Sequence, residues 1–157
     1  MIAIDTMLWI YNIDGNAPEH ENVRGWLEGD KHRGVIEREK IMINTVIVME
    51  IVHNLRRVAK LPAEDVYEYV FRTLTLRNLM IDALDFDTLN ESIIAFEDFF
   101  SHGIGGRDAT ILASMRKHGI SRLATHDRNL LSVIDVERVD PTYDPPHIFK
   151  RGERPYH

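Results

Sequence analysis

Four carboxylates lie where an apolar stretch of the chain passes into a helix, or just inside that helix: Asp5, Glu50, Asp108 and Asp127. Three of them, Asp5, Glu50 and Asp127, follow short apolar segments typical of buried strands, and the carboxyl ends of parallel strands meet at one edge of a sheet. Asp108 begins the helix that leads into the fourth such segment, so only packing would bring it to that edge. Because clustered carboxylates repel one another, their convergence predicts a bound cation, with a divalent metal ion as the first candidate.

Each carboxylate also has a structural interpretation. Asp108 and Asp127 could cap the helices that begin beside them, and Asp5 could be a turn residue. Glu50 is harder to explain in this way, because its helix is apolar around nearly the whole circumference and the side chain should be at least partly buried. A buried carboxylate needs a metal, another cation or a raised pKa. An ion pair with Arg57 or a neighbouring arginine is therefore the alternative to a metal at Glu50.

Four stretches of sequence give the acids a recognisable context: MIAIDT at 1–6, INTVIVME at 43–50, DATILA at 108–113 and LATHDRNL at 123–130. With them the chain resembles the PIN-domain nucleases, especially the small toxin ribonucleases of the VapC type. The resemblance runs through positions 1 to about 135 in the family's order. It implies a PIN-like three-layer α/β/α sandwich around a short parallel sheet of about five strands. It also implies cleavage of single-stranded RNA by the toxin of a toxin–antitoxin pair.

The resemblance assigns roles to the four acids. The family's acids fall on Asp5, Glu50, Asp108 and Asp127, which would bind Mg²⁺ or Mn²⁺ and catalyse hydrolysis of a phosphodiester. Mg²⁺ prefers oxygen ligands and keeps several waters, so a few carboxylates suffice to hold it. We expect Asp5 and Asp108 to be direct ligands, and Glu50 and Asp127 to hold waters on the metal or a second ion.

Two threonines and two arginines complete the predicted site. The family's hydroxyl before the last acid falls on Thr125, and Thr6 follows the first acid directly. Both would donate hydrogen bonds that orient carboxylates or water, with ordinary turn chemistry as the alternative. Arg107 and Arg128 are closest in sequence to the acids, and we expect them to contact RNA phosphates.

The chain departs from the family pattern at two places. The family often has Ser or Asn two positions after the first acid, where this chain has Met7, so a polar contact is missing there. The sequence after Asp140 is longer than the core fold requires. Neither departure removes a predicted metal ligand, and we therefore expect an active site.

Length and composition favour a single domain. The 157 residues are enough to bury a core, and we expect a nuclease domain over 1–140 and a tail over 141–157 that is an appendage or partly disordered. There is no cysteine, which excludes disulfides and thiolate metal sites. The N-terminus lacks a basic region before its apolar residues, and no apolar run approaches the roughly 20 residues of a membrane span. These features predict a cytoplasmic protein with no membrane association.

The net charge of −6 argues against tight binding to long duplexes. An enzyme that reads a few phosphates through metal and a local basic patch remains compatible with it. The alternation of short apolar segments with amphipathic ones predicts an α/β fold with parallel strands. We expect strands at 2–4, 41–44, 79–83, 122–124 and 136–139, and helices at 6–13, 18–28, 45–60, 62–76, 87–100, 108–118 and 128–133.

Two further interpretations concern partners and the class of protein. Toxins of this type pair with a small antitoxin and commonly form homodimers, and the helices at 18–28 and 62–76 could supply the surfaces or could be core. The alternative to a nuclease is a non-cleaving PIN-like module that binds RNA or protein. A di-iron site is disfavoured, because the Glu50-x-x-His53 motif has no second copy.

Overall fold

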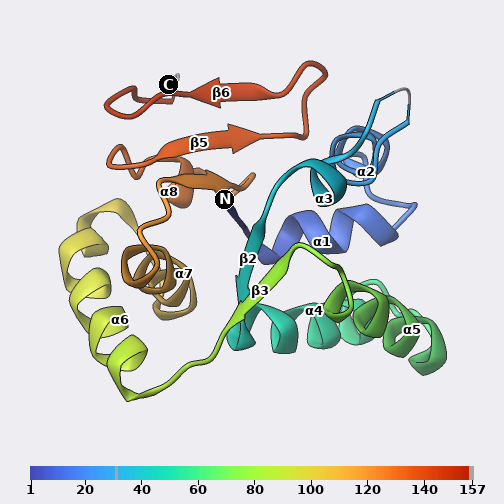
Figure 1. Cartoon of the computed structure of the whole chain (residues 1–157), viewed down its shortest axis with the longest axis horizontal. Coiled ribbons are helices and arrows are strands. Elements are labelled where there is room, and N and C mark those ends of the chain that lie inside the picture. The colour runs from blue at the N-terminus through green and yellow to red at the C-terminus, as the bar shows by residue number, and fades with distance from the viewer. Residues whose placement is uncertain (31, 156–157) are drawn as a thin grey trace.

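The computed structural model describes residues 1–30 and 32–155 and has an α/β architecture (Figure 1). The strands are β1 (Ile2–Ile4), β2 (Ile41–Asn44), β3 (Leu79–Asp82), β4 (Arg122–Ala124), β5 (Glu137–Asp140) and β6 (His147–Phe149). The helices are α1 (Thr6–Ile13), α2 (His20–Leu27), α3 (Val35–Arg38), α4 (Thr45–Arg57), α5 (Ala63–Leu74), α6 (Phe86–Phe99), α7 (Gly106–Lys117) and α8 (Arg128–Leu131), with a 3₁₀ turn η1 (Phe100–His102) before α7.

The strands form one sheet in the order β3-β2-β1-β4-β5-β6. The first five strands are parallel, as the sequence predicts, so their carboxyl ends lie at the same edge. β6 is antiparallel to β5, with Ile148 opposite Val139. This sixth strand comes from the segment after Asp140, which the sequence analysis treated as an appendage or a partly disordered tail. This strand has only three residues and is difficult to predict from the sequence. The prolines at 145 and 146 and the charged residues that follow it are typical of a loop.

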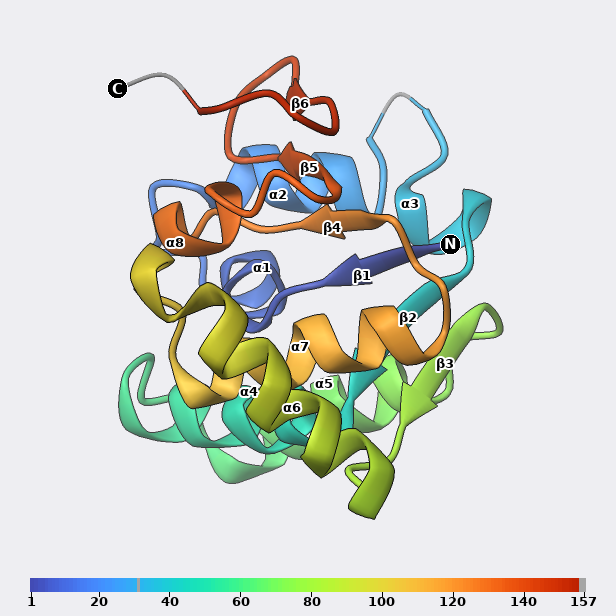
Figure 2. The same cartoon turned by 90° about the vertical axis from the view of Figure 1, so that its left-hand side faces the viewer.

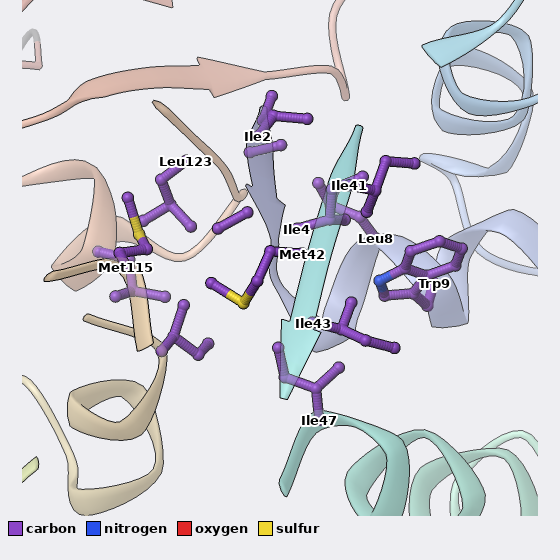
Figure 3. Close-up of a cluster of buried hydrophobic side chains, with 14 of the residues drawn as sticks. Ile2, Ile4, Leu8, Trp9, Ile41, Met42, Ile43, Ile47, Met115 and Leu123 are labelled. Carbon is purple, nitrogen blue, oxygen red and sulfur yellow. The ribbon is translucent and has the colours of Figure 1, made fainter. Parts of the chain in front are cut away.

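Helices cover both faces of the sheet, which confirms the predicted three-layer arrangement. α6 and α7 pack together on one face, and α1, α2, α4 and α5 cover the other (Figures 1 and 2). The core lies between these layers. Figure 3 shows Met42 pointing from β2 toward Met115 of α7, while Ile43 points to the opposite side, toward Trp9 of α1. This alternation follows from the two-residue period of a strand.

Local signals position the helices that carry the site. α4 begins directly after β2, and its N-cap is Asn44, whose side chain accepts from the N–H of Ile47 at 2.9 Å. Thr45 is the first residue of the helix. The charged segment at 29–40 contains the short helix α3 in its second half. In the part of the chain that the structure describes, no helix has the length and apolar character needed to cross a bilayer.

Candidate active site

Asp5 lies where β1 ends and α1 begins, and only 5% of its surface is exposed. Its N–H donates to the carbonyl of Ala124 at the end of β4, 3.0 Å away. The carboxylate accepts at both oxygens, from the N–H of Thr6 at 2.7 Å and from the hydroxyl of Thr125 at 2.9 Å. Asp5 therefore caps α1 and is also held at the carboxyl edge of the sheet.

Burial raises the pKa of Asp5 from 3.8 to about 7, because the charged carboxylate loses its hydration. The nearby charges of Asp108 and Asp127 contribute to this higher pKa, while the hydrogen bonds from Thr125 and Thr6 lower it. A carboxyl group with this pKa is partly protonated at neutral pH. A cation placed beside it would displace that proton.

Glu50 lies on α4, with 18% of its side chain exposed, and two residues contact its carboxylate. The hydroxyl of Thr6 donates to Oε2 at 2.8 Å. The guanidinium of Arg107 donates to Oε1 and forms an ion pair with it. The predicted arginine partner of Glu50 is thus present, but it is Arg107 from the start of α7 and not Arg57. Arg107, which we expected to contact an RNA phosphate, has 74% of its side chain exposed.

Asp108 lies in the first turn of α7 and is half-buried. Its Oδ2 accepts from the N–H of Gly105 at 3.3 Å. Burial raises the pKa of Asp108, and the charges of Asp127 and Glu50 act in the same direction. Packing of α7 against β2 has therefore brought this acid to the other three, as the prediction required.

Asp127 lies between β4 and α8, and the capping interpretation is correct for it. Its Oδ1 accepts from the N–H groups of Asn129 at 2.7 Å and Leu130 at 3.1 Å. The N–H of Asp127 donates to the hydroxyl of Thr125 at 3.0 Å, and that hydroxyl donates in turn to Asp5. Thr125 therefore links the first and the last of the four acids.

We call Asp5, Glu50, Asp108 and Asp127 the acidic cluster, because their charges act on one another's ionisation. The pKa of Asp5 responds to Asp108 and Asp127, and that of Asp108 responds to Asp127 and Glu50. Among residues 1–30 and 32–155, no group of three or more His, Asp or Glu side chains is arranged to hold a metal ion. Mg²⁺ does not need three, since it is often held by one or two carboxylates and retains water at its other positions. The hard oxygen donors of the cluster, one of them buried, therefore fit such an ion.

A second polar group beside the cluster was not predicted. Nδ1 of His126 lies 2.9 Å from Oδ2 of Asp140 and 3.1 Å from the hydroxyl of Thr142. The ring of Tyr11 meets that of His126 edge-on, with centroids 6.3 Å apart. Asp140 was not among the predicted site residues, although it ends a strand at the same edge as Asp5. Arg128, exposed at the start of α8, lines a pocket with His126.

Comparison with known proteins gives the architecture a context. The family model of the PIN domain matches residues 2–136. Among solved structures, FitAcB from Neisseria gonorrhoeae is 20% identical, with a TM-score of 0.64, covering 90% of this chain and 98% of that one. VapC20 from Mycobacterium tuberculosis, a Sarcin-Ricin loop cleaving toxin, is 18% identical, with a TM-score of 0.62 and coverage of 78% and 87%. A toxin–antitoxin complex from Klebsiella pneumoniae is 19% identical, with a TM-score of 0.54 and coverage of 81% and 87%. No curated protein matches the chain.

Proposed function

The chain belongs to the PIN domain family, and from that premise we propose that it is an endoribonuclease that uses Mg²⁺ or Mn²⁺ to hydrolyse single-stranded RNA. PIN domains are generally nucleases, and the similar structures are toxin–antitoxin proteins. The observation that carries the proposal is Asp5, a buried carboxyl near Asp108 and Asp127 whose pKa is raised to about 7. Such a group gains most from a cation, and hydrolysis of phosphodiesters is chemistry that bound divalent cations support.

We assign different roles to the four residues of the acidic cluster. Asp5 and Asp108 would hold the ion, and Glu50 and Asp127 would orient water around it. A bound Mg²⁺ or Mn²⁺ would neutralise charge on the phosphate and make the attacking water more acidic. Thr125 holds Asp5 in one orientation, and Thr6 does the same for Glu50. These fixed donors reduce the reorganisation that the carboxylates need when an ion and a phosphate enter.

The RNA substrate is supported by the similarity to VapC20, a toxin that cleaves the Sarcin-Ricin loop. Arg107 and Arg128 are the cations nearest in sequence to the cluster, and we assign them to phosphates of the strand. To contact a phosphate, Arg107 would have to break its ion pair with Glu50. This is feasible because most of the Arg107 side chain is already exposed to solvent. We place this activity in the cytoplasm.

The test is cleavage of a mixed-sequence single-stranded RNA by the purified chain. Cleavage should require Mg²⁺ or Mn²⁺, stop in EDTA and return when the metal is added back. The Asp5→Asn variant should be inactive while it keeps the fold. Undiminished cleavage in EDTA would contradict the proposed mechanism.

A second candidate function is a non-cleaving PIN-like module that binds RNA or protein. It is favoured by the engagement of Glu50 with Arg107, which occupies a carboxylate that catalysis would need. RNA binding that saturates with Mg²⁺ or Mn²⁺ present, without any cleavage of the bound strand, would select this candidate over the nuclease.

We propose a small antitoxin and a second copy of the chain as protein partners. Exposed apolar side chains gather on two helices, with Tyr67, Phe71 and Leu74 on α5 and Phe86, Leu89 and Ile93 on α6. The predicted helix at 18–28 is less suited, because Val23 and Leu27 of α2 belong to the core. Light scattering on the purified chain, alone and with the antitoxin, gives the number of copies in each state.

A further inference from the structure

A pocket separate from the acidic cluster lies between α8, β5 and the segment that forms β6. Its volume is about 580 Å³, within the range of sites that enclose a small molecule or a nucleotide. The end of α8 lies against β5, since the guanidinium of Arg138 on β5 donates to the carbonyl of Leu131. The side chains that matter here are His126, Arg128, Asp140, Tyr143, His147 and Phe149.

One wall of the pocket is aromatic. The rings of Tyr143 and His147 are stacked, with centroids 3.9 Å apart and planes inclined by 6°. The ring of buried Phe149 contacts that of His147 edge-on, with centroids 6.4 Å apart and an angle of 86° between the ring planes. Tyr143 is 47% exposed, so the stacked pair presents aromatic surface to solvent. Unpaired nucleobases bind to such surfaces, since every base has a flat π-face that can continue the stack.

Other residues that line the pocket are polar, and hydrogen bonds hold them in place. Asp140 is buried, and its carboxylate accepts from the N–H and the hydroxyl of Thr142, at 3.1 and 2.8 Å, and pairs with Nδ1 of His126. These contacts satisfy the carboxylate and hold the imidazole in place, which leaves Nε2 as the ring's other polar atom. Arg128 is exposed at the same pocket and has a guanidinium suited to a phosphate.

The pocket is adjacent to the acidic cluster in sequence and in space. His126 and Arg128 flank Asp127, and Tyr11 packs against His126. The pKa of Tyr11 is raised by burial first, and then by the charges of Glu19, Asp5 and Asp140. Tyr11 therefore lies near both Asp5 and Asp140, and a strand with a phosphate at the cluster would place a neighbouring nucleotide at the pocket.

The aromatic wall is anchored to the rest of the fold by Arg138 of β5, which is fully buried. Its guanidinium donates to the carbonyls of Leu131 at 2.9 Å, Val136 at 2.8 Å and Lys150 at 2.9 Å, and also to that of Glu153. These bonds tie the end of α8 and the segment after β6 to the same side chain. The wall is thus held in position before any ligand arrives, which lowers the entropic cost of binding.

Charge also favours a nucleic acid at this end of the molecule. The segment after β6 contains Lys150, Arg151 and Arg154 against the single acid Glu153, in a chain whose net charge is −6. We propose that the pocket binds one nucleotide of the RNA next to the cleaved phosphate, with the base stacked on Tyr143 and His147 and the phosphate on Arg128 and His126. This inference rests on the proposed ribonuclease function.

The test combines a protein variant with a matched change in the RNA. Tyr143→Ala removes the exposed ring of the stack, whereas Tyr143→Phe keeps it. Tyr143→Phe is therefore the matched control, because it removes only the hydroxyl and leaves the ring that stacks on His147. The RNA series is a set of short single strands of one sequence. Each member has a single abasic nucleotide, at a different position.

Binding of the RNA series in EDTA is followed by fluorescence anisotropy, and cleavage in Mn²⁺ by gel. We expect Tyr143→Ala to weaken binding and lower kcat/KM about tenfold, with Tyr143→Phe close to wild type. One abasic position should weaken binding to wild type about tenfold and leave binding to Tyr143→Ala unchanged, because the base and the ring act as a pair. Circular dichroism verifies that the variant is folded, and His147→Ala replaces it if it is not.

The outcomes separate this inference from the proposed function. Equal affinity of Tyr143→Ala and wild type for every RNA in the series overturns the nucleotide pocket, even if both proteins cleave RNA. Absence of cleavage by wild type in Mg²⁺ and Mn²⁺ overturns the nuclease. If wild type does not cleave, weaker binding of one abasic RNA by wild type, but not by Tyr143→Ala, would still support the pocket. The pocket would then be an RNA site on a non-cleaving module.

Discussion

The guanidinium of Arg107 is paired with the carboxylate of Glu50, and Thr6 donates to the second oxygen of that carboxylate. Both oxygens of Glu50 are therefore engaged before any metal or substrate binds. Arg107 is largely exposed, so the pair is worth about 1 kcal/mol of stability or less. A weak pair of this kind can open when a divalent cation or a phosphate competes for either partner.

The first prediction concerns Glu50→Gln. The amide keeps the shape and a hydrogen-bonding group but loses the charge that a metal needs, so RNA cleavage should fall about a hundredfold or more. The urea midpoint should change little, because the arginine left behind is solvated and not buried. Cleavage rate and urea midpoint are measured on the same preparation. An unstable protein with near-normal specific activity would show that Glu50 is structural.

Arg107→Gln is predicted to raise the affinity for Mn²⁺ a few-fold, because it removes the cation that competes for Glu50. Titration calorimetry on the full chain measures this, with Arg107→Lys as the variant that keeps the charge. If Arg107 also contacts a phosphate, Arg107→Gln should bind RNA more weakly than wild type under single-turnover conditions. An unchanged Mn²⁺ affinity would mean that Arg107 and the metal do not share Glu50.

The pKa of Asp5 predicts how stability depends on pH. The folded chain holds this proton with a pKa of about 7, against 3.8 as the ordinary value, so protonation favours the fold. This contribution is complete below pH 3.8 and is lost as pH rises through 7, at up to about 1.4 kcal/mol per pH unit. We expect the free energy of unfolding of metal-free Asp5→Asn to increase relative to that of wild type as pH rises from 5 to 7.5, as measured by urea unfolding. A constant difference across this range would contradict the assignment.

Thr125 is predicted to set the metal affinity through Asp5. Its hydroxyl lowers the pKa of that carboxyl, so Thr125→Val should raise the pKa and make the proton a stronger competitor of the metal. We expect weaker Mn²⁺ binding at pH 7 that recovers at pH 8.5. Thr125→Ser keeps the hydroxyl and serves as the control. A loss of affinity that does not recover at high pH would indicate misplacement of Asp5 and not a shift in its pKa.

Arg138→Met is predicted to destabilise the fold by about 3 kcal/mol or more, because buried carbonyls left without a donor cost roughly 1–3 kcal/mol each. Arg151→Met, an exposed residue just beyond β6, should change stability by less than about 0.5 kcal/mol. Urea unfolding compares the two, and proteolysis after Lys150, which both variants keep, reports release of the tail. Equal midpoints for both variants would mean that water replaces the guanidinium.

The sequence was sufficient to predict the parallel sheet and the meeting of Asp5, Glu50 and Asp127, because strand ends and helix starts are local signals. The place of Asp108 in the cluster followed from the resemblance, since no local rule brings the start of α7 to the edge of the sheet. The pairing of Glu50 with Arg107 could not be predicted in detail, because several arginines were equally available to sequence reasoning. β6 and the Tyr143–His147 stack were missed, because a three-residue strand beside two prolines depends on pairing with β5 and not on its own propensity.

The antiparallel pairing of β6 with β5 has a consequence for how the molecule behaves at high concentration. A parallel sheet that ended at β5 would expose a row of free backbone groups, and such an edge recruits strands from other chains. β6 occupies that edge with only three residues, and the proline before it has no N–H with which to extend a ladder outward. A chain ending at Asp140 should therefore self-associate into insoluble aggregates, whereas the full chain presents a short, blocked edge that discourages growth of a fibre.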